Sequence, residues 1–119
     1  MTRDDIAAEL ERRIGRIVVE RDRQNTFGGF RKLPEDRLIE LRIYEHAYLW
    51  AHGLLTNRNS LGEQCSKEFL VNGARRVVRQ YEGAISWGNE SADKQNAQDI
   101  AAYKEVVPLF EALSEAEDV

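Results

Sequence analysis

The side chains best suited to chemistry are two histidines and a single cysteine. His46 and His52 are six residues apart, so on one helix they point about 120° away from each other and cannot share a metal ion as an i,i+4 pair does. Cys65 would need a base or cation beside it to act as a nucleophile, and Arg76 and Arg79 lie more than two helical turns further along. We therefore expect a non-enzymatic protein with no metal site and no cofactor.

Two rows of arginine could in principle bind nucleic-acid phosphates. The rows are Arg12, Arg16 and Arg23, and Arg75, Arg76 and Arg79. Glutamates such as Glu9 and Glu20 interleave with the arginines at the i,i+4 spacing that favours pairing on the same helix. Because the isoelectric point is also near 5.3, we do not expect direct nucleic-acid binding. A nucleic-acid-associated accessory protein is the alternative, and it would use Arg12, Arg16, Arg75, Arg76 and Arg79.

A stronger signal lies on the third predicted helix, on a face turned away from its apolar stripe. The residues concerned are Phe69, Asn72, Arg76, Arg79 and Trp87. Aromatic and arginine side chains often anchor protein interfaces, because they bury a large area and arginine also forms hydrogen bonds. The pattern predicts a surface that binds a partner if the helix is continuous. If the helix breaks at Gly73, Phe69 instead turns into the core.

Charge is divided unevenly along the chain, whose net charge is −4. Residues 1–88 hold 15 bases and 13 acids, whereas residues 89–119 hold 2 bases and 8 acids. The acidic segment could be a solvated face, could pack on the second arginine row, or could enter a basic groove on another protein. In the last case the contacts include Glu105, Glu111 and Glu115, and the partner's groove could be one that normally holds nucleic acid.

The elements that must position these residues are four helices, indicated by apolar side chains recurring at helical spacing. We expect them at about residues 4–23, 34–55, 60–87 and 91–113. Thr2 with Asp5 can cap the first helix, Ser60 with Glu63 has the capping-box spacing for the third, and Ser91 is a candidate cap for the fourth.

The fold class is therefore all-α, either a four-helix bundle or an irregular four-helix array. Gly88 should end the third helix and Pro108 should kink the fourth. We expect one helical domain over residues 1–119, with an acidic, frayed tail at 114–119. A short echo joins residues 12–16 (RRIGR) to residues 75–79 (RRVVR).

The amino-acid composition indicates which class of protein this chain belongs to. A hydrophobic content of 42% fits a soluble globular chain, and no apolar run approaches the roughly 20 residues that cross a bilayer. The single Cys65 and the acids just after Met1 favour a cytoplasmic protein without a secretory signal.

We therefore predict a small helical protein that binds another protein and regulates or inhibits it. In size and charge class the chain resembles small acidic phage proteins that inhibit host defence nucleases, as anti-CRISPR proteins do. That resemblance implies a partner with a basic, nucleic-acid-binding surface. A structural homo-oligomer that buries the wide apolar face of the second helix is a further alternative.

Overall fold

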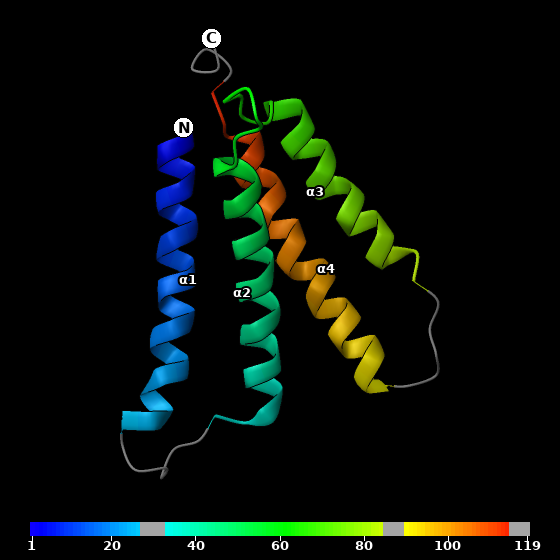
Figure 1. Ribbon diagram of the computed structural model, residues 1–119. Helices are drawn as coiled ribbons and strands as arrows, with labels where there is room; N and C mark the ends of the chain where they lie inside the picture. The colour runs from blue at the N-terminus through cyan, green and yellow to red at the C-terminus, as the bar shows by residue number, and fades with distance from the viewer. Residues whose placement is uncertain (27–32, 85–89, 115–119) are drawn as a thin grey trace.

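The computed structural model describes residues 1–26, 33–84 and 90–114, and the side chains of these residues except 23–26. Over this part, the chain forms four α-helices and no β-strand (Figure 1). The helices are α1 (Arg3–Thr26), α2 (Glu35–Thr56), α3 (Lys67–Glu82) and α4 (Glu90–Glu111). The all-α prediction is therefore confirmed.

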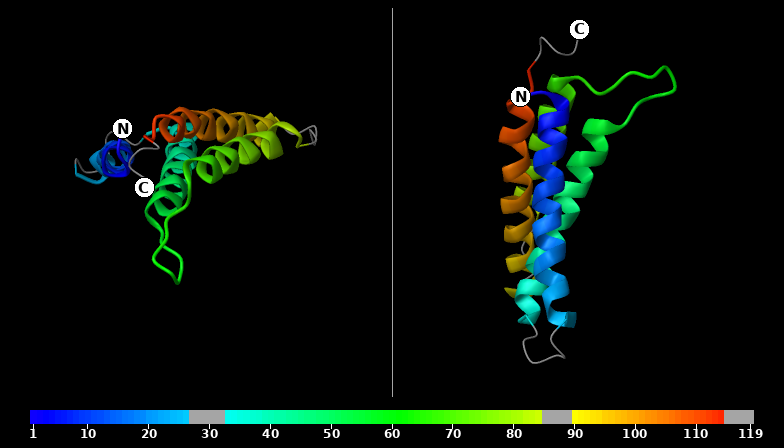
Figure 2. Two further views of the ribbon diagram at one scale, coloured as in Figure 1. Left: turned by 90° about the horizontal axis from the view of Figure 1, so that it is seen from above. Right: turned by 90° about the vertical axis from the view of Figure 1, so that its left-hand side faces the viewer.

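The helices pack in the spatial order α1, α2, α4, α3. α1 packs on α2, α2 packs on α4, and α3 packs on α4. The view from above shows α1 and α3 on opposite sides of the central pair (Figure 2). In a regular up-and-down bundle α2 and α3 would be close neighbours. Of the two predicted architectures, the structure is thus the irregular four-helix array.

The core comes from the apolar stripes that the helical spacing predicted. Two contiguous clusters of buried side chains fill the space between the helices. The largest fully buried side chains are Phe110, Ile6, Leu10, Leu55, Leu70, Leu113 and Val106. On the wide apolar face of α2, the buried residues are Leu41, Ala47, Tyr48, Ala51 and Leu55, because α2 packs on two neighbours.

The beginning of α1 follows the prediction. The Asp5 amide donates to the Thr2 hydroxyl at 2.9 Å, and the Thr2 amide donates to the Asp5 carboxylate at 3.0 Å. This reciprocal pair satisfies free donors at the helix start. The Met1 ammonium donates to the Ala112 carbonyl at 2.8 Å, which joins the start of α1 to the end of α4.

The predicted start of α3 at Ser60 is wrong. The Asn59 side chain accepts hydrogen bonds from the amides of Leu61 and Glu63, each at 2.9 Å, and Gly62 has a φ of +78°. These local bonds form a turn that competes with helix. The helix begins instead after Ser66, whose hydroxyl accepts from the Phe69 amide at 3.2 Å.

Two other predicted boundaries are also wrong. α3 ends at Glu82 rather than near residue 87, because Gly83 closes it by donating its amide to the Arg79 carbonyl at 2.9 Å. Ser91 lies inside α4, which already begins at Glu90. Pro108 also lies inside α4, and the helix continues beyond it to Glu111.

Candidate partner-binding surface on α3

α3 turns one face to the core and leaves the opposite face open. Leu70, Ala74 and Val78 are buried, whereas Phe69 is 57% exposed. The helix runs through Gly73 without interruption. Its continuity keeps Phe69 on the outer face, because residues at i and i+1 point in different directions on a helix. The structure therefore agrees with the continuous-helix alternative.

Phe69 borders a shallow hollow of about 340 Å³ on the outer face of α3. Asn72 and Arg76 lie one and two turns further along the same side, and Ser66 closes the end near the helix start. Within the described residues, the Arg76 side chain forms no ion pair. The hollow thus brings together an exposed aromatic ring and an unpaired guanidinium, two groups that are enriched at protein interfaces, with an amide between them. We call these residues, Phe69, Asn72 and Arg76, the outer α3 surface.

Arg79 lies on the other side of Asn72, in a groove between α3 and α4 with a volume of about 640 Å³. Arg75 and Arg79 line it from α3, and Lys104 lines it from α4. Val78, Val107 and Pro108 supply its apolar lining. Asn72 borders both this groove and the hollow beside Phe69. The structure thus divides the predicted contact residues between two adjoining recesses of one helix.

The predicted contacts from the acidic segment have partners within the chain. The Tyr48 hydroxyl donates to the Glu105 carboxylate. Glu111 lies 3.2 Å from Arg75, so the acidic segment does pack on the second arginine row at this point. Trp87 and Glu115 lie outside the described residues. α3 therefore offers a more open contact surface than α4.

Glu105 belongs to a polar network that sequence reasoning missed. Arg13 Nη1 lies 3.5 Å from Glu105 Oε2, and Arg13 Nε donates to Glu9 Oε1 at 3.0 Å. The Arg13 guanidinium also lies 5.5 Å from the centre of the Tyr48 ring. These contacts tie α1, α2 and α4 together beside a cavity of about 620 Å³. Three arginines and three glutamates line that cavity, so its charges balance.

The network changes the proton affinity of Tyr48. Burial raises the pKa of the Tyr48 hydroxyl, and the bond to Glu105 raises it further, because a neighbouring carboxylate disfavours the phenolate. Part of the network was visible in the sequence, since Glu9 and Arg13 have the i,i+4 spacing of an ion pair. Helical spacing could not have predicted the contact between Tyr48 and Glu105, because these two residues are 57 positions apart in the sequence.

The first arginine row is neutralised in part. Arg12 pairs with Glu9, and Arg16 lines the cavity that Glu9, Glu40 and Glu105 also border. The side chain of Arg23 lies outside the described part. Of this row, Arg12 has an ion-pair partner among the described residues, whereas Arg16 only borders a cavity that carboxylates share.

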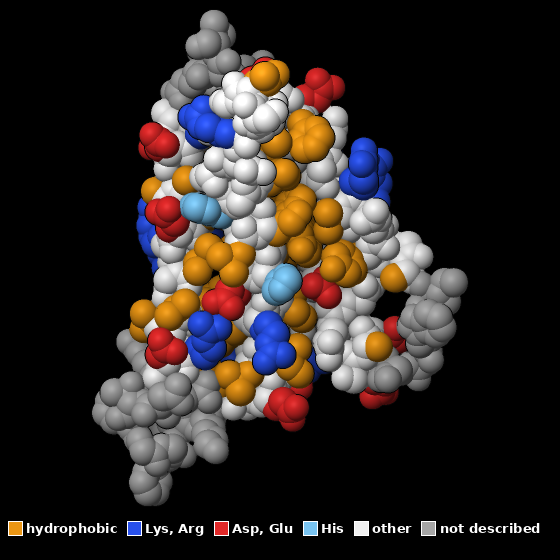
Figure 3. Space-filling view, viewed as in Figure 1, with side chains coloured by type: hydrophobic (Ala, Val, Ile, Leu, Met, Phe, Trp, Pro, Cys, Tyr) orange, Lys and Arg blue, Asp and Glu red, His pale blue; other side chains and the backbone are white. Residues whose placement is uncertain are grey.

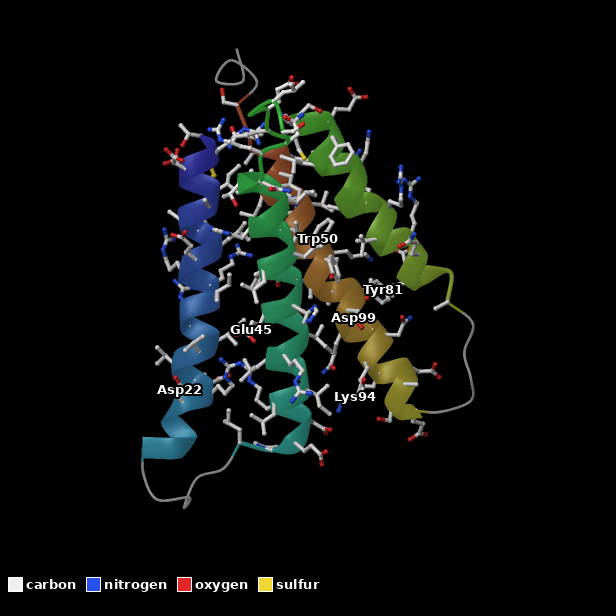
Figure 4. The ribbon with its side chains drawn as sticks, viewed as in Figure 1. Asp22, Glu45, Trp50, Tyr81, Lys94 and Asp99 are labelled. Atoms are coloured by element: carbon white, nitrogen blue, oxygen red, sulfur yellow. The ribbon has the colours of Figure 1, made fainter. Side chains whose placement is uncertain are left out.

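The potentially reactive side chains do not converge. His52 Nε2 lies 3.0 Å from Glu11, on the α1 side of α2. Figure 4 shows Asp99 of α4 near Tyr81 of α3. Glu45 of α2 lies away from both and pairs with Arg21 at 3.0 Å. Burial raises the pKa of Asp99. Among the described residues, no three His, Cys, Asp or Glu side chains could hold a metal ion together.

Apolar side chains also gather between α2 and α3 on the face seen in Figure 3. Trp50 is half-buried there and packs edge-on against Tyr103 of α4, with ring centres 5.5 Å apart. Tyr81 stacks on the same ring at 5.7 Å. Because Tyr103 engages both rings, this aromatic cluster holds α3 and α2 onto α4.

No protein-family model, curated protein or solved structure matches this chain. Within the described ranges, none of the helices combines the length and apolar character needed to cross a membrane.

Proposed function

We propose that this chain binds another protein through the outer α3 surface and regulates or inhibits that partner by covering part of its surface. The observation that carries the proposal is the exposure of Phe69 beside the hollow that Asn72 and Arg76 also line. A large exposed apolar ring gains free energy when a partner covers it. An adjacent arginine without an ion pair supplies the polar contact that gives such an interface its specificity.

Other exposed apolar residues provide a useful contrast. Leu49 lies on α2, and Leu61 lies in the turn before α3. Isolated exposed apolar side chains are normal on protein surfaces and require no partner. Phe69 differs because an amide and a guanidinium flank it in a shared hollow.

We also place the protein in the cytoplasm, since its one cysteine forms no internal disulfide framework.

The test compares partner capture by wild type with capture by Phe69→Ala and Arg76→Glu. Both side chains are exposed, so the variants should keep the helical circular-dichroism spectrum of wild type. We expect each to reduce binding of the captured protein by about tenfold or more, as for interface anchors. Leu49→Ala is the matched control, because it truncates a similarly exposed apolar side chain on α2. Equal retention by wild type and both α3 variants would refute the proposal.

A second candidate function is a nucleic-acid accessory protein, and the observation that favours it is the set of cations on α3. Arg76 and Arg79 form no ion pair among the described residues, and Arg75 and Lys104 lie nearby. A mobility shift with DNA or RNA that weakens steeply with salt, and is lost in Arg79→Glu, would favour this candidate over the first.

A further inference from the structure

The groove between α3 and α4 differs in charge from the other recesses described above. Among the described residues, its lining includes Arg75, Arg79 and Lys104 and no carboxylate. By contrast, the cavity beside Tyr48 has balanced charges, and the hollow beside Phe69 has one arginine and one glutamate. The groove therefore has a local excess of positive charge on a chain whose net charge is −4.

Two of these cations have partners at the ends of the groove. Arg75 lies 3.2 Å from Glu111, and Lys104 Nζ lies 3.8 Å from Glu82. All four side chains are about half exposed, and exposed pairs of this kind are weak and easily exchanged. Arg79 forms no ion pair among the described residues. An incoming carboxylate can thus pair with Arg79 directly and compete for the other two cations.

The apolar lining restricts what can occupy the groove. Val78 is buried and Val107 is half-buried, and together with exposed Pro108 they form an aliphatic strip between the cations of the two helices. A ligand that fits must carry negative charge along its edges and an apolar group between them. In the described part of the chain, no aromatic ring lines the groove, so a nucleotide base has no ring to stack on and the groove suits nucleic acid poorly.

We propose that the α3–α4 groove binds an acidic, amphipathic helical segment of a partner protein. Carboxylates of that segment pair with Arg79 and Lys104, and its apolar side chains cover Val78, Val107 and Pro108. The inference rests on the proposed function, because it gives the chemistry of the partner's contacting segment. It predicts that the bound protein presents acids to α3, in place of the basic partner that the acidic composition had led us to expect.

The experiment selects binders from a random peptide display library on the purified full chain. In parallel, selections use Arg79→Glu and Arg42→Glu, the latter a matched control because Arg42 is exposed on α2. We expect wild type and Arg42→Glu to enrich peptides rich in Asp and Glu with apolar residues at helical spacing. Fluorescence anisotropy then measures the affinity of the chain for these peptides. Arg79→Glu should lower that affinity by about tenfold or more, since the substitution replaces an attraction with a repulsion.

Two outcomes would overturn the inference: enriched peptides with no excess of acids, or equal binding by wild type and Arg79→Glu. A random-sequence oligonucleotide that displaces the peptides and itself requires Arg79 would also overturn it, in favour of nucleic acid. Phe69→Ala separates the two proposals. Binding that needs Phe69 but not Arg79 keeps the proposed function and removes this inference. Binding that needs Arg79 but not Phe69 keeps the groove and removes the outer α3 surface.

Discussion

Residues 12–16 and 75–79 resemble each other in sequence but lie in different surroundings. In the first segment, Arg12 pairs with Glu9, and Arg13 contacts Glu9, Glu105 and the ring of Tyr48. In the second segment, Arg75 pairs with Glu111, whereas Arg76 and Arg79 form no ion pair among the described residues. The packing of neighbouring helices makes the difference. α1 lies against acidic side chains of α2 and α4, whereas the outer side of α3 packs against none of the other described helices.

An arginine motif therefore does not determine its own role. The same residue type stabilises the fold where carboxylates from other helices reach it, and is free for a partner where they do not.

The largest effect should come from Arg13→Ala compared with Arg76→Ala. Arg13→Ala leaves Glu9, Glu105 and Tyr48 without their shared partner, and we expect the free energy of unfolding to fall by about 2 kcal/mol. Arg76→Ala should change it by less than about 0.5 kcal/mol, since nothing in the described part depends on that side chain. Urea denaturation followed by tryptophan fluorescence measures both. Similar losses in the two variants would show that the two segments are equivalent.

The next effect is alkaline destabilisation. Burial raises the pKa of Tyr48, as it does for Tyr44, Tyr81 and Tyr103. Above the ordinary tyrosine pKa of 10.0, the unfolded chain loses these protons while the folded chain keeps them. The free energy of unfolding should therefore hold its value below about pH 10 and fall as the pH rises further.

Tyr48→Phe should reduce the loss of unfolding free energy at high pH more than Tyr81→Phe does. The reason is that Tyr48 is buried and bonded to Glu105, whereas Tyr81 is half-buried on α3. Urea midpoints from about pH 8 to about pH 11 give both slopes. A steeper decline in Tyr48→Phe than in wild type would contradict the assignment of the raised pKa to this side chain.

The smallest effect should be the coupling between Arg75 and Glu111. Their contact of 3.2 Å is the point where α4 neutralises the second arginine row. Both side chains are about half exposed, so a double-mutant cycle with Arg75→Ala and Glu111→Ala should give a coupling energy below about 0.5 kcal/mol. A coupling above about 1.5 kcal/mol would mean that Arg75 serves the fold as Arg13 does, and is not available to a partner.

The sequence predicted the fold better than it predicted the site. Periodicity placed Ile6, Leu10 and Phe110 in the core, because burial selects apolar side chains at helical spacing. It misplaced the start of α3, since the side chain of Asn59 stabilises a turn that competes with the capping box of Ser60.

The candidate site depends on contacts between different helices, and local sequence patterns do not predict such contacts. The ring of Phe69 could have lain inside or outside, and only the continuity of α3 through Gly73 decided between the two. The roles of Glu105 and Arg79 depend on which helix lies beside them. Helix order in space, α1–α2–α4–α3, does not follow from helix order in sequence.

The attachment of α3 through α4 has a consequence for how this protein can evolve. Because α3 packs mainly on one helix, its outward side chains are distant from the buried contacts of α1 and α2. Substitutions at such separated positions have nearly additive effects and cost little stability. Selection can therefore rewrite the surface of α3 a few residues at a time, and track a changing partner, while the rest of the array keeps its sequence.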